Sequence, residues 1–199
     1  SNLMLNVESL VTQCLQLSAC HKAHCYPLLW HHQLLNMCHK VPATAAAKTP
    51  EPDADYVVPI GKARIALEAS AEKVETGESM VVITYGMGVH WALNAAKNHK
   101  GAVEVLDLRS IAPVDDEMVF NRVEKHGKCL VLTEETLYNS FAQSLAGRIS
   151  EHCFRSLDAP VFTQGAVDLP AVPLNMAQEA LMLPSAEKVS EKIRSILSY

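Results

Sequence analysis

The sequence predicts an α/β fold, a three-layer sandwich of about five strands and five helices. Residues 80–85 and 103–108 are short apolar runs rich in β-branched residues, which is typical of strands buried on both faces. Between them, Gly86-Met87-Gly88 breaks the first run, and small and apolar residues follow at helical spacing from Val89. Two parallel strands joined through a helix form a right-handed crossover unit, which favours an open sheet.

The elements on either side of this unit follow from local patterns. Residues 61–68 predict an edge strand with Ile65 and Leu67 facing inward. Asp115 is a suitable N-cap for a helix over residues 116–126, and Gly127 is placed as its left-handed stop. The other expected elements are a charged loop at 71–78, a loop at 110–114, a strand at 128–133, a helix at 141–154, a turn at 157–160, a strand at 161–164, an irregular stretch at 168–173, a short helix at 175–182 and a last helix at 186–198.

Composition divides the chain and excludes some partners. Residues 1–40 are expected to be a poorly determined extension that starts with Ser1-Asn2, a pair typical of tag removal, and residues 41–55 a proline-rich linker before a domain at 56–199. The net charge of −5 gives no general attraction to nucleic acid or anionic lipid, and no apolar run is long enough to cross a membrane. Six cysteines in a chain of 199 residues favour a reducing compartment.

The first forty residues offer one candidate metal site. Cys20, His21, His24 and Cys25 place four possible zinc ligands close together. Structural zinc sites usually repeat a ligand pair further along the chain, and no clean second pair is present. The alternative is a poorly determined extension or the truncated end of a neighbouring domain.

The glycine turn between the first two buried strands offers a candidate nucleotide site. Dinucleotide-binding folds place their phosphate loop here, but Trp91 occupies the position of their third glycine. The alternative is a tight strand-to-helix turn. His90 lies at the ligand-facing edge without an evident catalytic partner, and Glu134-Glu135 point to opposite faces as neighbours in a strand. Cys129 and Cys153 fit buried apolar positions. The residues alone therefore indicate a non-catalytic α/β module.

Several segments in order resemble one family, the C-terminal domain of the beta subunit of thiamine diphosphate-dependent 2-oxo acid dehydrogenase decarboxylases. They are Asp55–Arg64, Thr84–His90, Val103–Arg109 with Ala112-Pro113, Ala146–Phe154, Leu157–Val161 and Leu183–Ser185. The resemblance covers residues 55–199. It implies a transketolase C-terminal domain fold, in which a mixed five-stranded sheet has its first strand antiparallel at an edge.

The resemblance also implies an activity that lies outside this chain. The whole enzyme would use thiamine diphosphate and magnesium to decarboxylate a 2-oxo acid and acylate lipoyl groups. The branched-chain 2-oxoisovalerate type is favoured, with pyruvate and acetoin left open. In that family the cofactor lies between the alpha subunit and a beta-subunit domain that is absent here. We therefore expect no catalytic, cofactor-binding or metal-binding residue in this chain, and no activity from it in isolation.

The partners that the resemblance implies are an alpha subunit or alpha domain, a second beta copy, and the small subunit-binding domain of the lipoyl acyltransferase. Tyr199 and Asp168 are the candidate residues for that last partner. The chain departs from the family pattern at residues 138–141, where many relatives have paired glycines, and in a longer loop at 168–173. These departures are compatible with a branch in which alpha and beta parts are fused.

Two rival assignments and a location complete the expectations. The C-terminal domain of a transketolase or a deoxyxylulose-phosphate synthase would share the fold, although residues 157–161 favour the dehydrogenase branch. A stand-alone nucleotide- or anion-binding module at Gly86–His90 is the other alternative. The expected location is the bacterial cytoplasm, or the mitochondrial matrix for a eukaryotic source.

Overall fold

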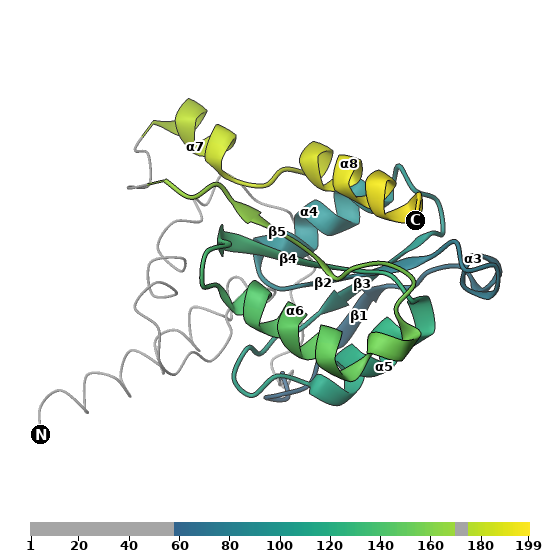
Figure 1. Ribbon diagram of the computed structural model, residues 1–199. Coiled ribbons are helices and arrows are strands. Elements are labelled where there is room, and N and C mark those ends of the chain that lie inside the picture. Colours follow the sequence, from purple (N-terminus) through teal and green to yellow (C-terminus); the bar gives the residue numbers. More distant parts are fainter. Residues whose placement is uncertain (1–57, 170–174) are drawn as a thin grey trace, which may run out of the picture.

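A computed structural model describes residues 58–169 and 175–199 and shows a five-stranded mixed sheet (Figure 1). The strand order is β1-β3-β2-β4-β5, with β1 antiparallel to β3 at one edge and the other pairs parallel. The strands are β1 (Arg64–Leu67), β2 (Met80–Thr84), β3 (Val103–Asp107), β4 (Cys129–Thr136) and β5 (Phe162–Ala166). This topology confirms the predicted fold class. The expectations for residues 1–55, the zinc site and the linker included, lie outside the described residues.

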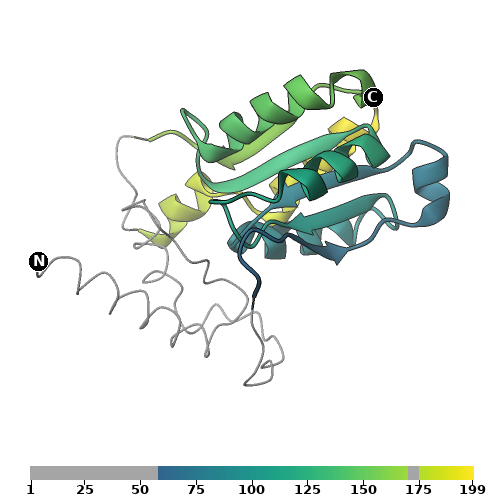
Figure 2. The same ribbon diagram turned by 90° about the horizontal axis from the view of Figure 1, so that it is seen from below.

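Helices cover both faces of the sheet, which makes three layers (Figures 1 and 2). Helices α4 (Met87–Ala96) and α8 (Ala186–Leu197) pack on one face, and α5 (Asp116–His126) and α6 (Phe141–His152) pack on the other. Short helices complete the described part: α3 (Ala71–Glu75), α7 (Met176–Met182) and the 3-10 turn η1 (Phe154–Ser156).

The buried strands alternate their side chains between the two layers. In β2, Val81 and Ile83 join the core beneath α5 and α6, whereas Met80 and Val82 join the core beneath α4 and α8. All four side chains are 0% exposed. Because both faces of the strand are covered, its sequence is continuously apolar instead of alternating.

The ends of α5 are as the sequence predicts. The Asp115 carboxylate accepts a hydrogen bond from the backbone N–H of Met118 at 3.4 Å and a second from that of Ala63 at 3.0 Å. At the other end, Gly127 has φ 68° and donates its N–H to the Val123 carbonyl at 2.9 Å. Asp115 therefore caps the helix and also ties it to the chain that leads into β1.

Two local predictions were wrong. The expected loop at 71–78 begins with the five-residue helix α3, because Ser70 caps it by accepting a hydrogen bond from the Lys73 N–H. Leu67 does not face inward and is 38% exposed. The pairing of β1 with β3 shifts by one residue between Ile65 and Leu67, so strict alternation along the strand fails.

Candidate functional site

Polar side chains gather at the carboxyl edge of the sheet, where open α/β folds bind ligands. Tyr85 follows β2, Asp107 is the last residue of β3, and Glu135 is the residue before the last in β4. His90 stands in the first turn of α4. The contacts of these groups decide whether this edge holds a reacting centre or a structural network.

Tyr85 and Glu135 belong to a hydrogen-bonded network that fixes the start of α6. The Tyr85 hydroxyl lies 2.7 Å from Thr133 Oγ1 and donates to Glu135 Oε1 at 3.4 Å. The same Glu135 oxygen accepts the backbone N–H of Phe141, the first residue of α6, at 2.9 Å. Burial and the neighbouring Glu135 carboxylate raise the pKa of Tyr85 well above its ordinary value, so the hydroxyl remains a proton donor at neutral pH. This arrangement stabilises a helix N-terminus.

The sequence reasoning did not find this network because its members lie far apart along the chain. Tyr85, which had not been singled out, precedes Thr133 by 48 residues and Glu135 by 50. Alternation along β2 and β4 places Tyr85, Thr133 and Glu135 on the face of the sheet that carries Ile83 and Val131. Only the pairing of the two strands shows that these positions meet.

The glycine turn is built for close packing between α4 and β2. Gly86 has φ 59°, a backbone conformation that favours glycine. A Cβ at Gly88 would overlap the Oγ1 atom of the buried Thr84 and would lie 3.6 Å from Leu132. The glycine at position 88 is therefore explained by the close approach of α4 to β2, which is the structural interpretation of the turn.

Asp107 is held by groups around it instead of standing as a free acid. Its carboxylate accepts a hydrogen bond from the backbone N–H of Arg109 at 3.2 Å and lies 3.5 Å from the guanidinium of Arg64. Arg64 of β1 is the residue that pairs with Asp107 of β3 in the sheet. Burial lowers the pKa of the half-buried His90, against the opposing effect of Asp107. His90 is thereby favoured in its neutral form near neutral pH.

The two residues predicted to bind a partner lie at opposite ends of β5. Tyr199 is exposed and its ring lies 5.6 Å from that of Phe162, at the start of the strand. Asp168 is exposed and follows the strand end at Ala166 by two residues. β5 lies between the two positions and spans five residues, or about 13 Å at about 3.3 Å per residue. The structure does not bring them together into one site.

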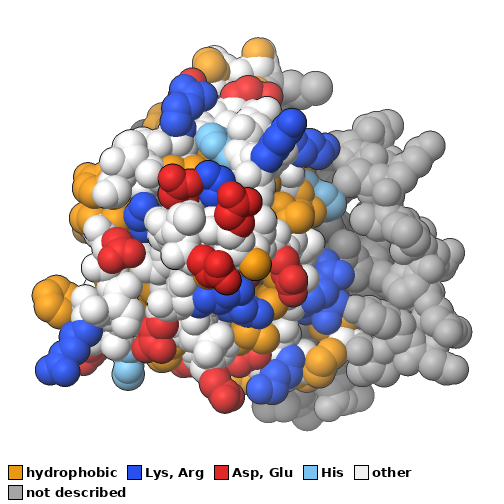
Figure 3. Space-filling model, turned by 90° about the vertical axis from the view of Figure 1, so that its right-hand side faces the viewer, with side chains coloured by type: hydrophobic (Ala, Val, Ile, Leu, Met, Phe, Trp, Pro, Cys, Tyr) orange, Lys and Arg blue, Asp and Glu red, His pale blue; other side chains and the backbone are white. Residues whose placement is uncertain are grey.

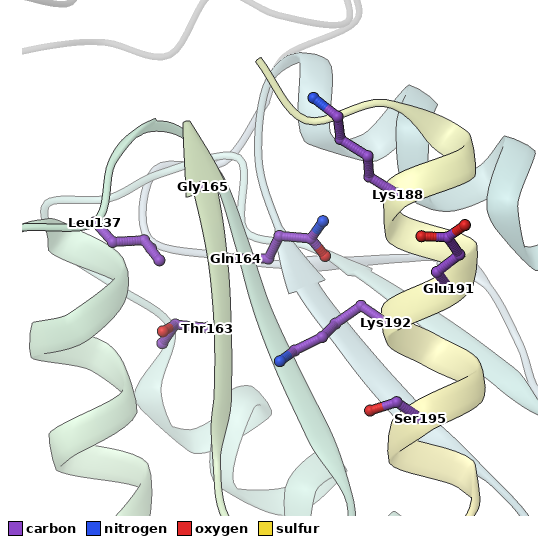
Figure 4. Close-up of a pocket in the computed structure, with 8 residues that line it drawn as sticks. All are labelled: Leu137, Thr163, Gln164, Gly165, Lys188, Glu191, Lys192 and Ser195. Atoms are coloured by element: carbon purple, nitrogen blue, oxygen red, sulfur yellow. The ribbon is translucent and has the colours of Figure 1, made fainter. Parts of the chain in front are cut away.

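A hollow of about 390 Å³ runs along the outer edge of β5, between the strand and α8 (Figure 4). Its lining includes Gln164 and Lys192, whose ammonium lies 4.7 Å from the centre of the Phe162 ring. Lys188 lines it as well, but donates to the carbonyls of Leu181 at 2.9 Å and Leu183 at 2.8 Å. The hollow is therefore an edge groove whose cations already have contacts.

Other described residues supply no alternative centre. Within residues 58–169 and 175–199, no cluster of three acidic, histidine or cysteine side chains could hold a metal ion. In the same stretches no helix is both long and apolar enough to span a bilayer. The surface that carries α3 and the C-terminal residue intersperses basic and acidic side chains, without a broad field of one sign (Figure 3). Cys129 and Cys153 are buried free thiols, as predicted.

Comparison with known protein families tests the fold and the motifs. The family model described as "Transketolase, C-terminal domain" matches residues 69–189. The chain belongs to the transketolase C-terminal domain family. This match confirms the resemblance found in the sequence. The antiparallel first strand lies before the matched residues and is shown by the pairing of β1 with β3.

The curated relatives of this transketolase C-terminal domain are beta subunits of 2-oxo acid dehydrogenases. The chain is 36% identical over 151 residues to the 2-oxoisovalerate dehydrogenase subunit beta of Bacillus subtilis, covering 74% of this chain and 44% of that protein. It is 32% identical over 145 residues to the pyruvate dehydrogenase E1 component subunit beta of Rhizobium meliloti, covering 71% and 30%. The chain thus spans less than half the length of these relatives.

A solved structure supports the fold. A split-gene transketolase, described as an inactive beta4 tetramer, matches with a TM-score of 0.57 and 19% identity over 73% of this chain and 45% of that chain. At this identity the match speaks for the fold alone. Among the described residues, no group of three histidine, cysteine, aspartate or glutamate side chains is placed to hold a magnesium ion, and we name none of them as a ligand of thiamine diphosphate.

Proposed function

We propose that this chain is the assembly domain of the beta part of a 2-oxo acid dehydrogenase, with the branched-chain 2-oxoisovalerate type favoured over pyruvate. The observation that carries the proposal is the 36% identity over 151 residues to a 2-oxoisovalerate dehydrogenase beta subunit. The complete enzyme would decarboxylate a 2-oxo acid and acylate lipoyl groups. Thiamine diphosphate and magnesium would be held by polypeptide outside the described residues.

The geometry of the carboxyl edge favours a structural role for this edge, not a catalytic one. Glu135 is engaged by Tyr85 and by the first N–H of α6, and Asp107 is engaged by Arg64 and Arg109. These acids thus hold secondary-structure elements in place. The chain by itself would therefore be inactive.

The assembly would involve an alpha subunit or alpha domain, a second beta copy and the subunit-binding domain of the lipoyl acyltransferase. Asp168 and Tyr199 remain our candidate contacts for the acyltransferase. Because they lie at opposite ends of β5, they would touch different parts of that domain or different copies of it. A bacterial cytoplasm, or a mitochondrial matrix for a eukaryotic source, would be the compartment of such a complex.

The test is binding of the acyltransferase subunit-binding domain to the full chain, measured by calorimetry. Asp168→Lys should weaken binding at least about tenfold, since it reverses a charge that would face basic residues of the partner. Glu151→Gln, an exposed acid on α6, is the matched control and should bind like the wild type. Unchanged binding by Asp168→Lys would remove Asp168 from the interface, and no binding by the wild type would reject acyltransferase docking.

A further inference from the structure

The edge groove between β5 and α8 has polar side chains on both of its walls (Figure 4). Residues 163–165 of β5 form one wall. The other wall comes from α8, at spacings of three and four residues that place side chains on one face of a helix: Lys188, Glu191, Lys192 and Ser195. The volume of about 390 Å³ is within the range of sites for small molecules.

Gln164 is a polar residue on the face of β5 that α8 covers. It lies two positions after Phe162 and therefore shares a face with it, and Phe162 packs against the core beneath α4 and α8. The Gln164 side chain points from β5 toward α8 (Figure 4). Its Oε1 atom is buried, and no described residue donates a hydrogen bond to it. A buried carbonyl oxygen without a donor is costly, so a ligand that brings an N–H or O–H group gains by pairing with it.

Lys192 contributes a cation whose N–H donors have no acceptor among the described residues. Its ammonium lies 4.7 Å from the centre of the Phe162 ring, and a contact with the face of a ring engages the charge without providing a hydrogen-bond acceptor. The Lys188 ammonium, in contrast, donates to the carbonyls of Leu181 and Leu183. Lys192 is therefore the cation of the groove that can bind an anionic group.

Glu191 adds an exposed carboxylate to the α8 wall, across the groove from Gln164 (Figure 4). It forms no ion pair with another described residue. The groove thus presents a cation, an anion and a carbonyl acceptor together. Glu191 would repel a ligand that carries only negative charge, and Lys192 would repel one that carries only positive charge. A small molecule with both charges matches all three groups.

We propose that the edge groove binds a small zwitterion of the amino-acid class. The ligand's carboxylate pairs with the Lys192 ammonium. Its own ammonium donates to Gln164 Oε1 and faces the Glu191 carboxylate. Leu137, which also lines the groove, offers an apolar contact to an alkyl side chain. This site goes beyond the proposed function and does not rest on it.

The experiment titrates L-norleucine into the isotope-labelled full chain and follows the side-chain amide of Gln164 and the backbone amide of Gly165 by nuclear magnetic resonance. Both signals should shift and saturate, with a dissociation constant on the order of 1 mM for so small a ligand in an open site. Hexanoate lacks the ammonium and pentylamine lacks the carboxylate. At the same ionic strength, each should bind at least about tenfold more weakly than L-norleucine.

Single-residue variants test the two charged groups separately. Lys192→Met should weaken binding of L-norleucine at least about tenfold, and Glu191→Gln at least about threefold. Arg194→Met is the matched control, because it removes a positive charge from an exposed position of α8 outside the lining and should bind like the wild type. Glu191→Gln changes an exposed side chain, so it should melt like the wild type by circular dichroism and keeps the test valid if Lys192→Met loosens the fold.

Three results would overturn the zwitterion site. The first is the absence of saturable shifts at Gln164 and Gly165. The second is binding of hexanoate as tight as that of L-norleucine, which would show a simple anion site. The third is an equal loss of binding from Lys192→Met and Arg194→Met, which would show a general effect of charge. All three concern the groove alone and leave the proposed function to its own binding experiment.

Discussion

A buried ion network joins β3 to α5 and allows a quantitative test of how this domain is held together. Glu104 is 0% exposed in the middle of a buried strand. Its carboxylate lies 3.3 Å from Arg122 Nε, 3.6 Å from Lys125 Nζ and 3.3 Å from His126 Nε2, all on α5. His126 Nδ1 is in turn 2.7 Å from Ser79 Oγ.

Replacing Glu104 by glutamine keeps the size of the side chain and removes its charge. Removing one partner from a buried ion pair costs about 3–5 kcal/mol, because the remaining charges are left unpaired. Arg122 and Lys125 are 18% and 38% exposed and can turn toward water, which reduces the loss. We therefore expect Glu104→Gln to lower the free energy of unfolding by about 2–3 kcal/mol and the melting temperature by roughly 5–10 °C.

The effect should depend on pH in a defined direction. Burial alone would raise the pKa of Glu104, but the contacts with His126, Arg122 and Lys125 outweigh it and hold the pKa below the ordinary value of 4.5. A carboxyl whose pKa is lower in the folded state stabilises the fold fully above its unfolded pKa. That contribution is lost as the pH falls through the folded pKa. The difference between wild type and Glu104→Gln should thus be constant near neutral pH and shrink below about pH 4.5.

The assay is urea unfolding of the full chain by far-ultraviolet circular dichroism, repeated between pH 7 and pH 3. Glu124→Gln is the matched control, since it makes the same substitution at an exposed position of α5 and should change stability by less than about 0.5 kcal/mol. A loss below 0.5 kcal/mol from Glu104→Gln at pH 7 would refute the reasoning. So would a loss that stays the same down to pH 3.

Two further predictions concern packing and thiol chemistry. Gly88→Ala should lower the free energy of unfolding by about 1–3 kcal/mol, because its Cβ would overlap Thr84 Oγ1. Gly147→Ala has no atom within 4 Å of the new Cβ and should raise the free energy of unfolding by about 0.5–1 kcal/mol. Urea unfolding that shows the two variants changing stability in the same direction would contradict this. Cys129 and Cys153 should resist alkylation at pH 8 until the protein unfolds, since burial raises the pKa of both thiols, that of Cys129 to about 12. Peptide mapping by mass spectrometry checks this, and labelling of either thiol in the native state would disprove it.

Much of the fold could be predicted because its signals are local. The apolar runs of β2 and β3, the cap at Asp115 and the stop at Gly127 each depend on residues within a few positions of one another. Family resemblance added the antiparallel edge strand. The misplaced side chain of Leu67 arose where pairing between strands shifts the register, which neighbours in sequence do not reveal.

The sites were harder to predict than the elements. Tyr85 was overlooked because its role depends on Thr133 and Glu135, which are about 50 residues away along the chain and meet it only through the pairing of β2 with β4. Asp168 and Tyr199 were named together because the family resemblance implied both as contacts of one partner. Only the course of β5 shows that a strand's length separates them.

The sequence by itself determined the class of fold and its helix boundaries to within a few residues, because hydrophobic periodicity and capping act over one or two turns of chain. The family followed from the resemblance of several motifs in the same order. Tertiary structure decided which polar groups meet. It placed Glu104 against Arg122, Lys125 and His126 of α5 and joined Tyr85 to Glu135. Contacts of that kind depend on strand register and on how helices lie across the sheet, and these are set by packing between segments distant in sequence.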